Sequence, residues 1–392
     1  MTHWLVQAPF LLLLFILPFP GTVALRLLCL TLAFALAVVY LRRTKPPSFP
    51  WKTIFTLWIV IALLSLGYAV DAAYSLGEIK NEIGYTMMAL LAFYVFSESE
   101  LAVRRGAWAV ALSLSVISIW ALWLWAGSGY WHEDAGHGGS GNFAGLILMA
   151  APALFLIWVL QPRARWLVIL ISLIALLAGA YSRQRVIWPA LGIEMGALVI
   201  MLRHSRETAL SGWRTAAFSA LILLMVAILL LATQGARIGA HGGLVEMQND
   251  PRLRNWPAVI ASITARPLTG AGFGRDAMKL GHPELLPHDV KDFWHAHNVF
   301  LNYGLAMGIP GMFALAFLFG CLALTYWRMY RSPERKLVAL GIAGIVLLAG
   351  VILRNLSNDL FLRDVALLFW ALNGLFLGYG LRLQSRQRQA VE

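Results

Sequence analysis

The stretch "DFWHAHNVFLNYGLAMGIPG", residues 292–311, changes character at Asn298. The residues before Asn298 are mostly acidic, aromatic or histidine, whereas those after it begin an apolar run that continues to about residue 326. A helix of about 20 apolar residues crosses the hydrocarbon core of a bilayer. The stretch therefore predicts a membrane-spanning helix, with His295 and His297 at the point where the chain enters the membrane.

Apolar runs recur along the whole chain, which is 60% hydrophobic and only 13% charged. Soluble domains contain about 25% charged residues, so this composition excludes an ordinary soluble protein. The runs predict an all-α integral membrane protein with about 12 transmembrane helices. We place these spans near residues 4–20, 22–41, 53–70, 84–97, 106–126, 143–160, 166–181, 186–202, 214–232, 298–326, 337–353 and 365–381. The first run lacks the basic region and the cleavage site of a signal peptide, and we expect it to be retained as a span.

Basic residues in alternate loops predict the orientation, because Lys and Arg accumulate on the cytoplasmic side of a membrane protein. One set of loops carries 18 of the 31 basic residues, at 42–52, 97–105, 161–166, 203–214, 328–336 and 382–389. We therefore expect both chain ends in the cytoplasm. The outer loops are then residues 71–83, 127–142, 182–185, 233–297 and 354–364.

This topology divides the chain into three parts. Residues 1–232 form transmembrane helices 1–9, and residues 233–297 form one long outer loop that contains helices. Residues 298–392 form transmembrane helices 10–12 and a cytoplasmic tail. The net charge of +12 resides largely in the short loops, where orientation and lipid head groups explain it, so we expect no nucleic-acid partner. Cys29 and Cys321 lie in apolar runs, which argues against a disulfide framework or a thiolate metal site.

Positive charge in the outer loops opposes this orientation and requires another explanation. Arg183 and Arg185 lie in the tight turn "YSRQRVIW", and the long loop carries Arg252, Arg254 and Arg266 among others. Guanidinium groups match phosphate geometry through paired donors, so an anionic ligand is one explanation. Snorkelling to lipid phosphates at the outer head groups is the other.

The long loop contains a predicted helix followed by a glycine-rich turn. Asp250, followed by proline, is typical of a helix start, and Arg266, also followed by proline, ends the amphipathic pattern. Gly270 and Gly272 of "TGAGFGR" would let backbone N–H groups approach an anion closely. Because the turn follows a helix instead of a strand, it is not a dinucleotide-binding motif.

A polar cluster follows this turn and raises the question of a metal site. Imidazole and carboxylate groups suit zinc or manganese. However, the spacing matches no known ligand motif, so we predict no metal and keep a catalytic metal as the lesser alternative. The cluster comprises His282, Glu284, His288, Asp289, Asp292, His295 and His297.

His297 stands at the entrance of the span and has two interpretations. A histidine there can cap the helix or meet lipid head groups. Imidazole is also the side chain best suited to take a proton from a hydroxyl at neutral pH. His297 is therefore a candidate general base beside several candidate anion-binding arginines.

Two motifs in this region resemble a known family. "HNVFLNYGLAMGIPGM" fits His-Asn, nine residues, then Gly-x-x-Gly, and "RLRNWPAVIASITARPLTGAGFG" resembles an arginine–tryptophan–helix–Pro-Leu-x-Gly-x-Gly-x-Gly stretch. Both lie in or next to the long outer loop of a chain with about twelve predicted spans. In this order and on this side, they resemble the O-antigen ligases of Gram-negative bacteria, which belong with the O-antigen polymerases.

The resemblance implies a glycosyltransferase of lipopolysaccharide biosynthesis. Such ligases move a glycan from undecaprenyl diphosphate to lipid A–core at the periplasmic face of the inner membrane. They use no nucleotide, are thought to need no metal, and have an architecture similar to that of GT-C enzymes. The implied partners are the lipid-linked glycan, lipid A–core and membrane lipids, with no cofactor.

The resemblance also implies roles for particular residues. His297 matches the essential histidine and would act as the general base. Arg183 and Arg185, together with Arg252 or Arg254, match by position the arginines that bind the diphosphate. Supporting candidates are Asn298, Arg266, Gly270, Gly272 and His295.

Three other functions stay open at this stage. An O-antigen polymerase uses the same donor, but such polymerases generally lack the His-Asn-x9-Gly-x-x-Gly element. A protein O-glycan transferase of the same superfamily is the second. A lipid-linked glycan transporter is the third, although transporters are expected to carry charges near the middle of the membrane.

Overall fold

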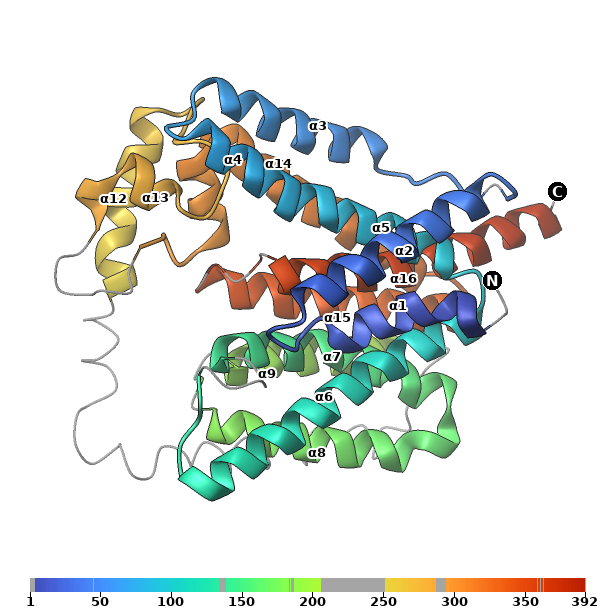
Figure 1. Cartoon of the computed structure of the whole chain (residues 1–392). Coiled ribbons are helices and arrows are strands. Elements are labelled where there is room, and N and C mark those ends of the chain that lie inside the picture. Colours follow the sequence, from blue (N-terminus) through green and yellow to red (C-terminus); the bar gives the residue numbers. More distant parts are fainter. Residues whose placement is uncertain are drawn as a thin grey trace.

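The computed structural model describes residues 4–44, 46–133, 139–182, 184, 187–205, 251–286, 294–357, 359, 361 and 363–391. The regular structure in these ranges is helical, and they contain no β-strand. Long apolar helices lie side by side, as Figure 1 shows, and both chain ends lie at one end of the bundle. The protein is therefore an all-α membrane protein, as the composition predicts.

The helices of the first half are α1 (Trp4–Ile16), α2 (Val23–Leu41), α3 (Lys52–Leu64), α4 (Ala72–Glu78), α5 (Tyr85–Phe96), α6 (Glu100–Ser128), α7 (Ser140–Leu160), α8 (Arg165–Tyr181) and α9 (Ile187–His204). Those of the second half are α12 (Pro251–Ala265), α13 (Ala277–Gly281), α14 (Val299–Tyr330), α15 (Arg335–Leu356) and α16 (Arg363–Val391). Short turns of other helical types are η1 (Ser65–Gly67), η2 (Ile79–Gly84), η3 (Pro162–Ala164) and η4 (Pro283–Leu285).

Within the described residues, eight helices are long and apolar enough to cross a membrane: α2, α6, α7, α8 with η3, α9, α14, α15 and α16. The predicted spans 4–20, 53–70 and 84–97 coincide with the shorter helices α1, α3 with η1, and α5. The predicted span 214–232 lies outside the described residues. A total of about twelve spans and a GT-C-like architecture stay predictions.

Helices α5, α15 and α16 pack against most of the other long helices. The last helix, α16, packs along α5, while α15 contacts α14, α7 and α9. The core at these contacts contains large side chains such as Trp370, Phe376 and Tyr326, each at most 2% exposed. Several outward-facing leucines and phenylalanines, including Phe313 and Phe317, are instead exposed. Such an apolar exterior is expected where lipid surrounds the protein.

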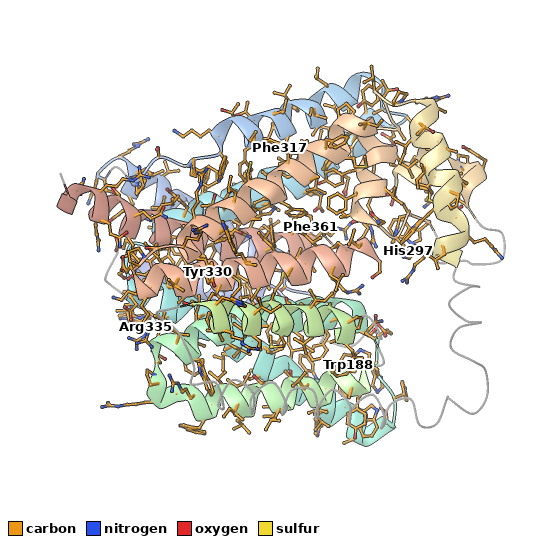
Figure 2. All side chains as sticks on the ribbon, turned by 180° about the vertical axis from the view of Figure 1, so that it is seen from behind. Trp188, His297, Phe317, Tyr330, Arg335 and Phe361 are labelled. Carbon is orange, nitrogen blue, oxygen red and sulfur yellow. The ribbon has the colours of Figure 1, made fainter. Side chains whose placement is uncertain are left out.

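The described part of the long loop, residues 251–286 and 294–297, lies at one end of the bundle. Helix α12 runs across this end, next to the start of α14, and the chain ends lie at the other end (Figure 1). Figure 2 places His297 and Arg335 at opposite ends of the molecule. The basic loop around Arg335 and the histidine pair are thus on opposite sides, as the charge distribution predicts.

Candidate active site at the loop end of the bundle

Asn298, directly after the histidine pair, caps the start of α14. The side-chain oxygen of Asn298 accepts hydrogen bonds from the N–H groups of Phe300 (3.0 Å) and Leu301 (3.2 Å). Its Nδ2 donates to the carbonyl of Leu356 at the end of α15, at 3.1 Å. Asn298 is therefore an N-cap that also ties α14 to α15. The predicted supporting residue has a positioning role.

His297 itself has an unusual backbone conformation. Its φ is +50°, and Arg363 is the only other non-glycine residue with positive φ in the described part of the chain. Such conformations are uncommon outside glycine and persist only where surrounding contacts enforce them. The half-buried ring of His297 stacks near that of His295, with 3.9 Å between ring centroids. The structure thus holds this imidazole in one place at the entrance of α14 (Figure 2).

His295 is buried and surrounded by hydrogen-bond donors. Nη2 of Arg275 lies 2.6 Å from its Nε2, and the backbone N–H of His297 donates to its Nδ1 at 3.0 Å. A neutral imidazole has one acceptor nitrogen, so the two donors compete for it. Burial, followed by the charges of Arg275, His297 and Arg252, lowers the pKa of His295 to about 2. His295 therefore stays neutral and serves to position His297, whereas His297 is the candidate base.

Helix α12 is fixed against the histidines by Trp256. The indole Nε1 of Trp256 donates to the carbonyl of Ala296 at 2.9 Å. Arg252 precedes Trp256 by four residues and therefore shares its face of the helix. The side chain of Arg252 is half-buried and its charge acts on both His295 and Arg354. Arg254 is exposed. Of the two arginines that the sequence left open, Arg252 is therefore the one that lies on the helix face next to the histidines.

The glycine-rich turn packs on α14 and uses two of its N–H groups in that contact. The N–H groups of Ala271 and Gly272 donate to the carbonyls of Leu305 (2.8 Å) and Ala306 (3.0 Å). A side chain at Gly270 would place its Cβ 2.3 Å from the carbonyl oxygen of Leu305. Gly270 and Gly272 therefore allow close backbone contact with α14, which gives these glycines a reason other than the predicted support of anion binding.

Contact with the segment before this turn also explains Gly308 of the second glycine motif. Gly308 has φ +70° and interrupts the helical conformation of α14. The interruption lets the N–H of Ile309 donate to the carbonyl of Pro267 at 2.8 Å. A Cβ at Gly308 would lie 2.6 Å from that carbonyl oxygen. The two sequence motifs are thus halves of one interlocked structure.

Arg275 follows this interlock and was not among the predicted site residues. Its guanidinium lies over the ring of Trp294, 4.5 Å from the centroid, in addition to its contact with His295. Burial lowers the pKa of Arg275, while the nearby carboxylate of Asp359 acts in the opposite direction. In the sequence, its position directly after residues 269–274 was a signal, because the contact between the glycine-rich turn and α14 holds the next side chain in place.

Two carboxyl groups lie near Arg275. Asp359 is buried, which raises its pKa to about 6, although Arg275 and a hydrogen bond from Asn302 favour its charged form. Glu82 in η2 accepts two hydrogen bonds from the backbone N–H of Arg363, at 2.8 and 3.0 Å. Burial nevertheless raises the pKa of Glu82 to about 8. Burial thus favours the uncharged form of both carboxyl groups, and Arg275 opposes this effect at Asp359.

The remaining predicted residues divide into two groups. Arg183 and Arg185 lie outside the described residues, but Gln184 between them donates to Oγ of Ser140 at 2.7 Å. That contact places Gln184 next to the first residue of α7. Arg266 is exposed at the end of α12, and its charge acts on Glu284.

The structure describes only some of the histidines and acids of the predicted polar cluster. Nδ1 of His282 lies 3.2 Å from Oε1 of Glu284. His288, Asp289 and Asp292 lie outside the described residues. Within the ranges that the structure describes, no group of three or more His, Cys, Asp or Glu side chains is arranged to hold a metal ion.

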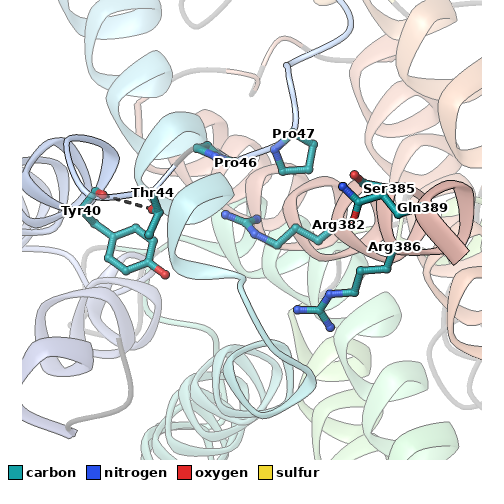
Figure 3. Close-up of a pocket in the computed structure, with 8 residues that line it drawn as sticks. All are labelled: Tyr40, Thr44, Pro46, Pro47, Arg382, Ser385, Arg386 and Gln389. Atoms are coloured by element: carbon teal, nitrogen blue, oxygen red, sulfur yellow. Dashed lines mark hydrogen bonds between the residues drawn. The ribbon is translucent and has the colours of Figure 1, made fainter.

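A cavity of about 240 Å³ lies at the opposite end of the bundle (Figure 3). It is lined by the end of α2 and the end of α16, including Tyr40, Arg382 and Arg386. Arg382 is already used within the protein, because Nη1 donates to the carbonyls of Tyr94 (2.7 Å) and Gly378 (2.8 Å). This cavity lies at the other end of the bundle from His297, and Arg382 caps the end of α5.

These features define a multi-pass membrane protein with a cationic, histidine-containing site at one end. Residues 170–316 match a family model described as O-antigen ligase, which covers α9, α12, α13, the histidine pair and the break in α14. Over these residues the chain is similar to the O-antigen ligase family. At family level this supports an O-antigen ligase or polymerase type of function, with lipid-linked glycan and membrane lipids as general partners. A comparison with curated proteins found no match.

Proposed function

We propose that the protein transfers an O-antigen glycan from undecaprenyl diphosphate to lipid A–core at the periplasmic face of the bacterial inner membrane. One observation carries this proposal: Arg252 and Arg275 act on the His295–His297 pair at the end of the bundle that α12 covers. A donor that carries two phosphates supplies the negative charge that this arrangement needs. The glycan and the sugar that accepts it are not specified by these residues.

The reaction follows from the residue types. The acceptor hydroxyl attacks the anomeric carbon, and the bond from that carbon to the diphosphate oxygen breaks. His297 takes the hydroxyl proton, and the lipid diphosphate leaves with the bonding electrons. Direct attack inverts the anomeric centre. Arginines preplaced on the diphosphate stabilise the charge that develops on it, and each such donor is worth roughly 10²–10³ in rate.

The arginines distinguish this mechanism from one that depends on a metal. Guanidinium groups offer the diphosphate paired planar donors and fixed positive charge, which is the role of a divalent cation in many phosphate sites. In our proposal Arg183 and Arg185 complete the set from the turn beside α7. We therefore propose metal-independent transfer.

A reconstituted reaction tests this function. Purified protein in liposomes is mixed with lipid-diphosphate-linked glycan and lipid A–core, without nucleotide and with excess chelator. We expect the glycan to appear on lipid A–core, detected as a mass shift of that lipid. Lengthening of the lipid-linked glycan without lipid A–core would identify a polymerase, and absence of any new covalent product would point to transport. Activity lost with chelator and restored by a divalent ion would contradict metal independence.

Arg252 and Arg254 form a matched pair for a further test. They lie on the same helix, two residues apart, but only Arg252 shares the Trp256 face. We expect Arg252→Lys to lower transfer by roughly 10–100-fold, because lysine lacks paired planar donors. Arg254→Lys should stay within about twofold of the parent. Initial rates of glycan transfer decide the comparison, and equal losses in both variants would contradict the assignment of Arg252.

A further inference from the structure

Arg354 is a buried cation that the mechanism above does not use. It lies two residues before the end of α15 and is 3% exposed. Its Nε and Nη2 atoms are buried and have no hydrogen-bond partner among the described residues. Guanidinium stays protonated in proteins, so this group cannot escape the cost of burial by losing its charge. The arrangement therefore calls for an anionic partner.

Among the described residues that line the space beside Arg354, none is that partner. A small space beside its side chain is lined by residues of α7, α15 and α16, and the described lining residues include no acid. They are Gly145, Leu148, Met149, Val351, Asn355 and Val365. The amide of Asn355 donates to the carbonyl of Val351 at 2.8 Å. The space beside Arg354 is thus otherwise apolar.

The depth of Arg354 distinguishes it from the other arginines. The α7 residues beside it, Gly145 to Met149, follow the first residue of that helix by five to nine positions. At 1.5 Å per residue, Arg354 lies roughly 7–14 Å inside the outer end of α7. Arg252 instead belongs to α12, which crosses the end of the bundle (Figure 1). Its charge acts on both Arg354 and His295, which places Arg252 within electrostatic reach of both.

We infer that Arg354 binds the lipid-proximal phosphate of the lipid diphosphate donor, while Arg252 binds the sugar-proximal phosphate beside the histidines. The inference rests on the proposed function. A lipid-linked diphosphate enters with its prenyl chain in the membrane, so its lipid-proximal phosphate is the deeper of the two. The deeper arginine is then its ligand.

The two arginines should affect different kinetic constants. Charge develops on the sugar-proximal phosphate as the glycosidic bond breaks, whereas the lipid-proximal phosphate changes little. A residue that binds the ground state and the transition state equally contributes to KM alone. We expect Arg354→Gln to raise KM for the donor at least tenfold with kcat within about threefold of the parent, and Arg252→Gln to lower mainly kcat.

A binding experiment tests the assignment without depending on transfer. The purified full-length protein in detergent micelles is titrated with farnesyl monophosphate and with farnesyl diphosphate, and binding is followed by intrinsic tryptophan fluorescence. Arg354→Gln should weaken both probes about tenfold or more, because both carry a lipid-proximal phosphate. Arg252→Gln should weaken only the diphosphate. Arg331→Gln, at an exposed position between α14 and α15, should change neither.

The outcomes separate this inference from the proposed function. If the parent binds neither probe, the proposed donor is wrong. If the parent binds both and Arg354→Gln binds them equally well, only the role of Arg354 is wrong. Loss of the diphosphate alone in Arg354→Gln would assign Arg354 to the other phosphate and overturn the depth argument.

A second variant excludes a purely structural role for Arg354. Glu194 of α9 is fully buried, and its carboxylate has no hydrogen-bond partner among the described residues. It packs against Gly350, one turn before Arg354 on α15. If Arg354 only balanced the charge of Glu194, the neutral double variant Arg354→Met/Glu194→Met would bind both probes like the parent. We expect it to bind them as weakly as Arg354→Gln, and recovery would overturn the inference.

Discussion

Replacement of His297 by alanine lowers the rate of glycan transfer by about 10²–10⁴-fold, the usual contribution of a placed general base. The side chain is half-buried at the surface of the bundle and belongs to no packed core, so the variant should insert and purify like the parent. Donor binding should persist, because the arginines supply it. The measurement is the initial rate of transfer to lipid A–core in liposomes, together with the melting temperature of the purified protein.

The pH dependence of the same reaction separates the two histidines. The pKa of His295 is lowered to about 2, so His295 is uncharged throughout the working range and contributes no inflection near neutral pH. A general base must be unprotonated to accept a proton, so the transfer rate should fall towards low pH. His295→Asn should keep that fall, and His297→Ala should abolish it. Near-parental transfer by His297→Ala would return this residue to a structural role.

Replacement of Gly270 by alanine separates the glycine-rich turn from α14. The added Cβ would lie 2.3 Å from the carbonyl oxygen of Leu305 and 2.4 Å from the backbone carbon of Ala306. Backbone on both sides must move, at a cost of about 1–3 kcal/mol or more. The turn positions Arg275 against His295, so its displacement should also reduce transfer by at least tenfold. A lower melting temperature and a lower transfer rate are the expected results.

Gly77→Ala is the matched control for this experiment. Gly77 lies in α4 near the same end of the bundle, and a Cβ there would meet nothing within 4 Å. This variant should melt and transfer like the parent. If Gly270→Ala also behaves like the parent, the interlock between the turn and α14 does not hold the site.

Several elements were predictable because their signal is local. A run of apolar residues must bury or satisfy its own backbone in the membrane as a helix, so α2, α6, α7, α8, α9, α14, α15 and α16 follow closely from composition. The start of α14 at Val299 also follows from a local signal, the capping side chain of Asn298. The unusual conformation of His297 does not, because φ +50° is enforced by contacts that the sequence does not show.

The site required contacts between residues far apart in the chain. The choice between Arg252 and Arg254 depends on the hydrogen bond from Trp256 to the carbonyl of Ala296, 40 residues away. The function of Gly270 depends on Leu305, and a glycine-rich turn looks the same in sequence whether its N–H groups meet a ligand or another helix. Arg354 could have been singled out as a positive charge at the outer end of a span, the same signal that drew attention to Arg183 and Arg185.

By itself, the sequence determined the membrane class and the long apolar helices, because hydrophobicity and capping act over a few neighbouring residues. The outer position of the long loop and the role of His297 as a base stay predictions. Only the tertiary structure decided that the two glycine motifs interlock, that His295 is buried, and that Arg275 contacts it. The physical reason is that a side chain's burial and charge environment depend on which distant segments pack against it. Backbone hydrogen bonds between the turn and α14 make those choices here.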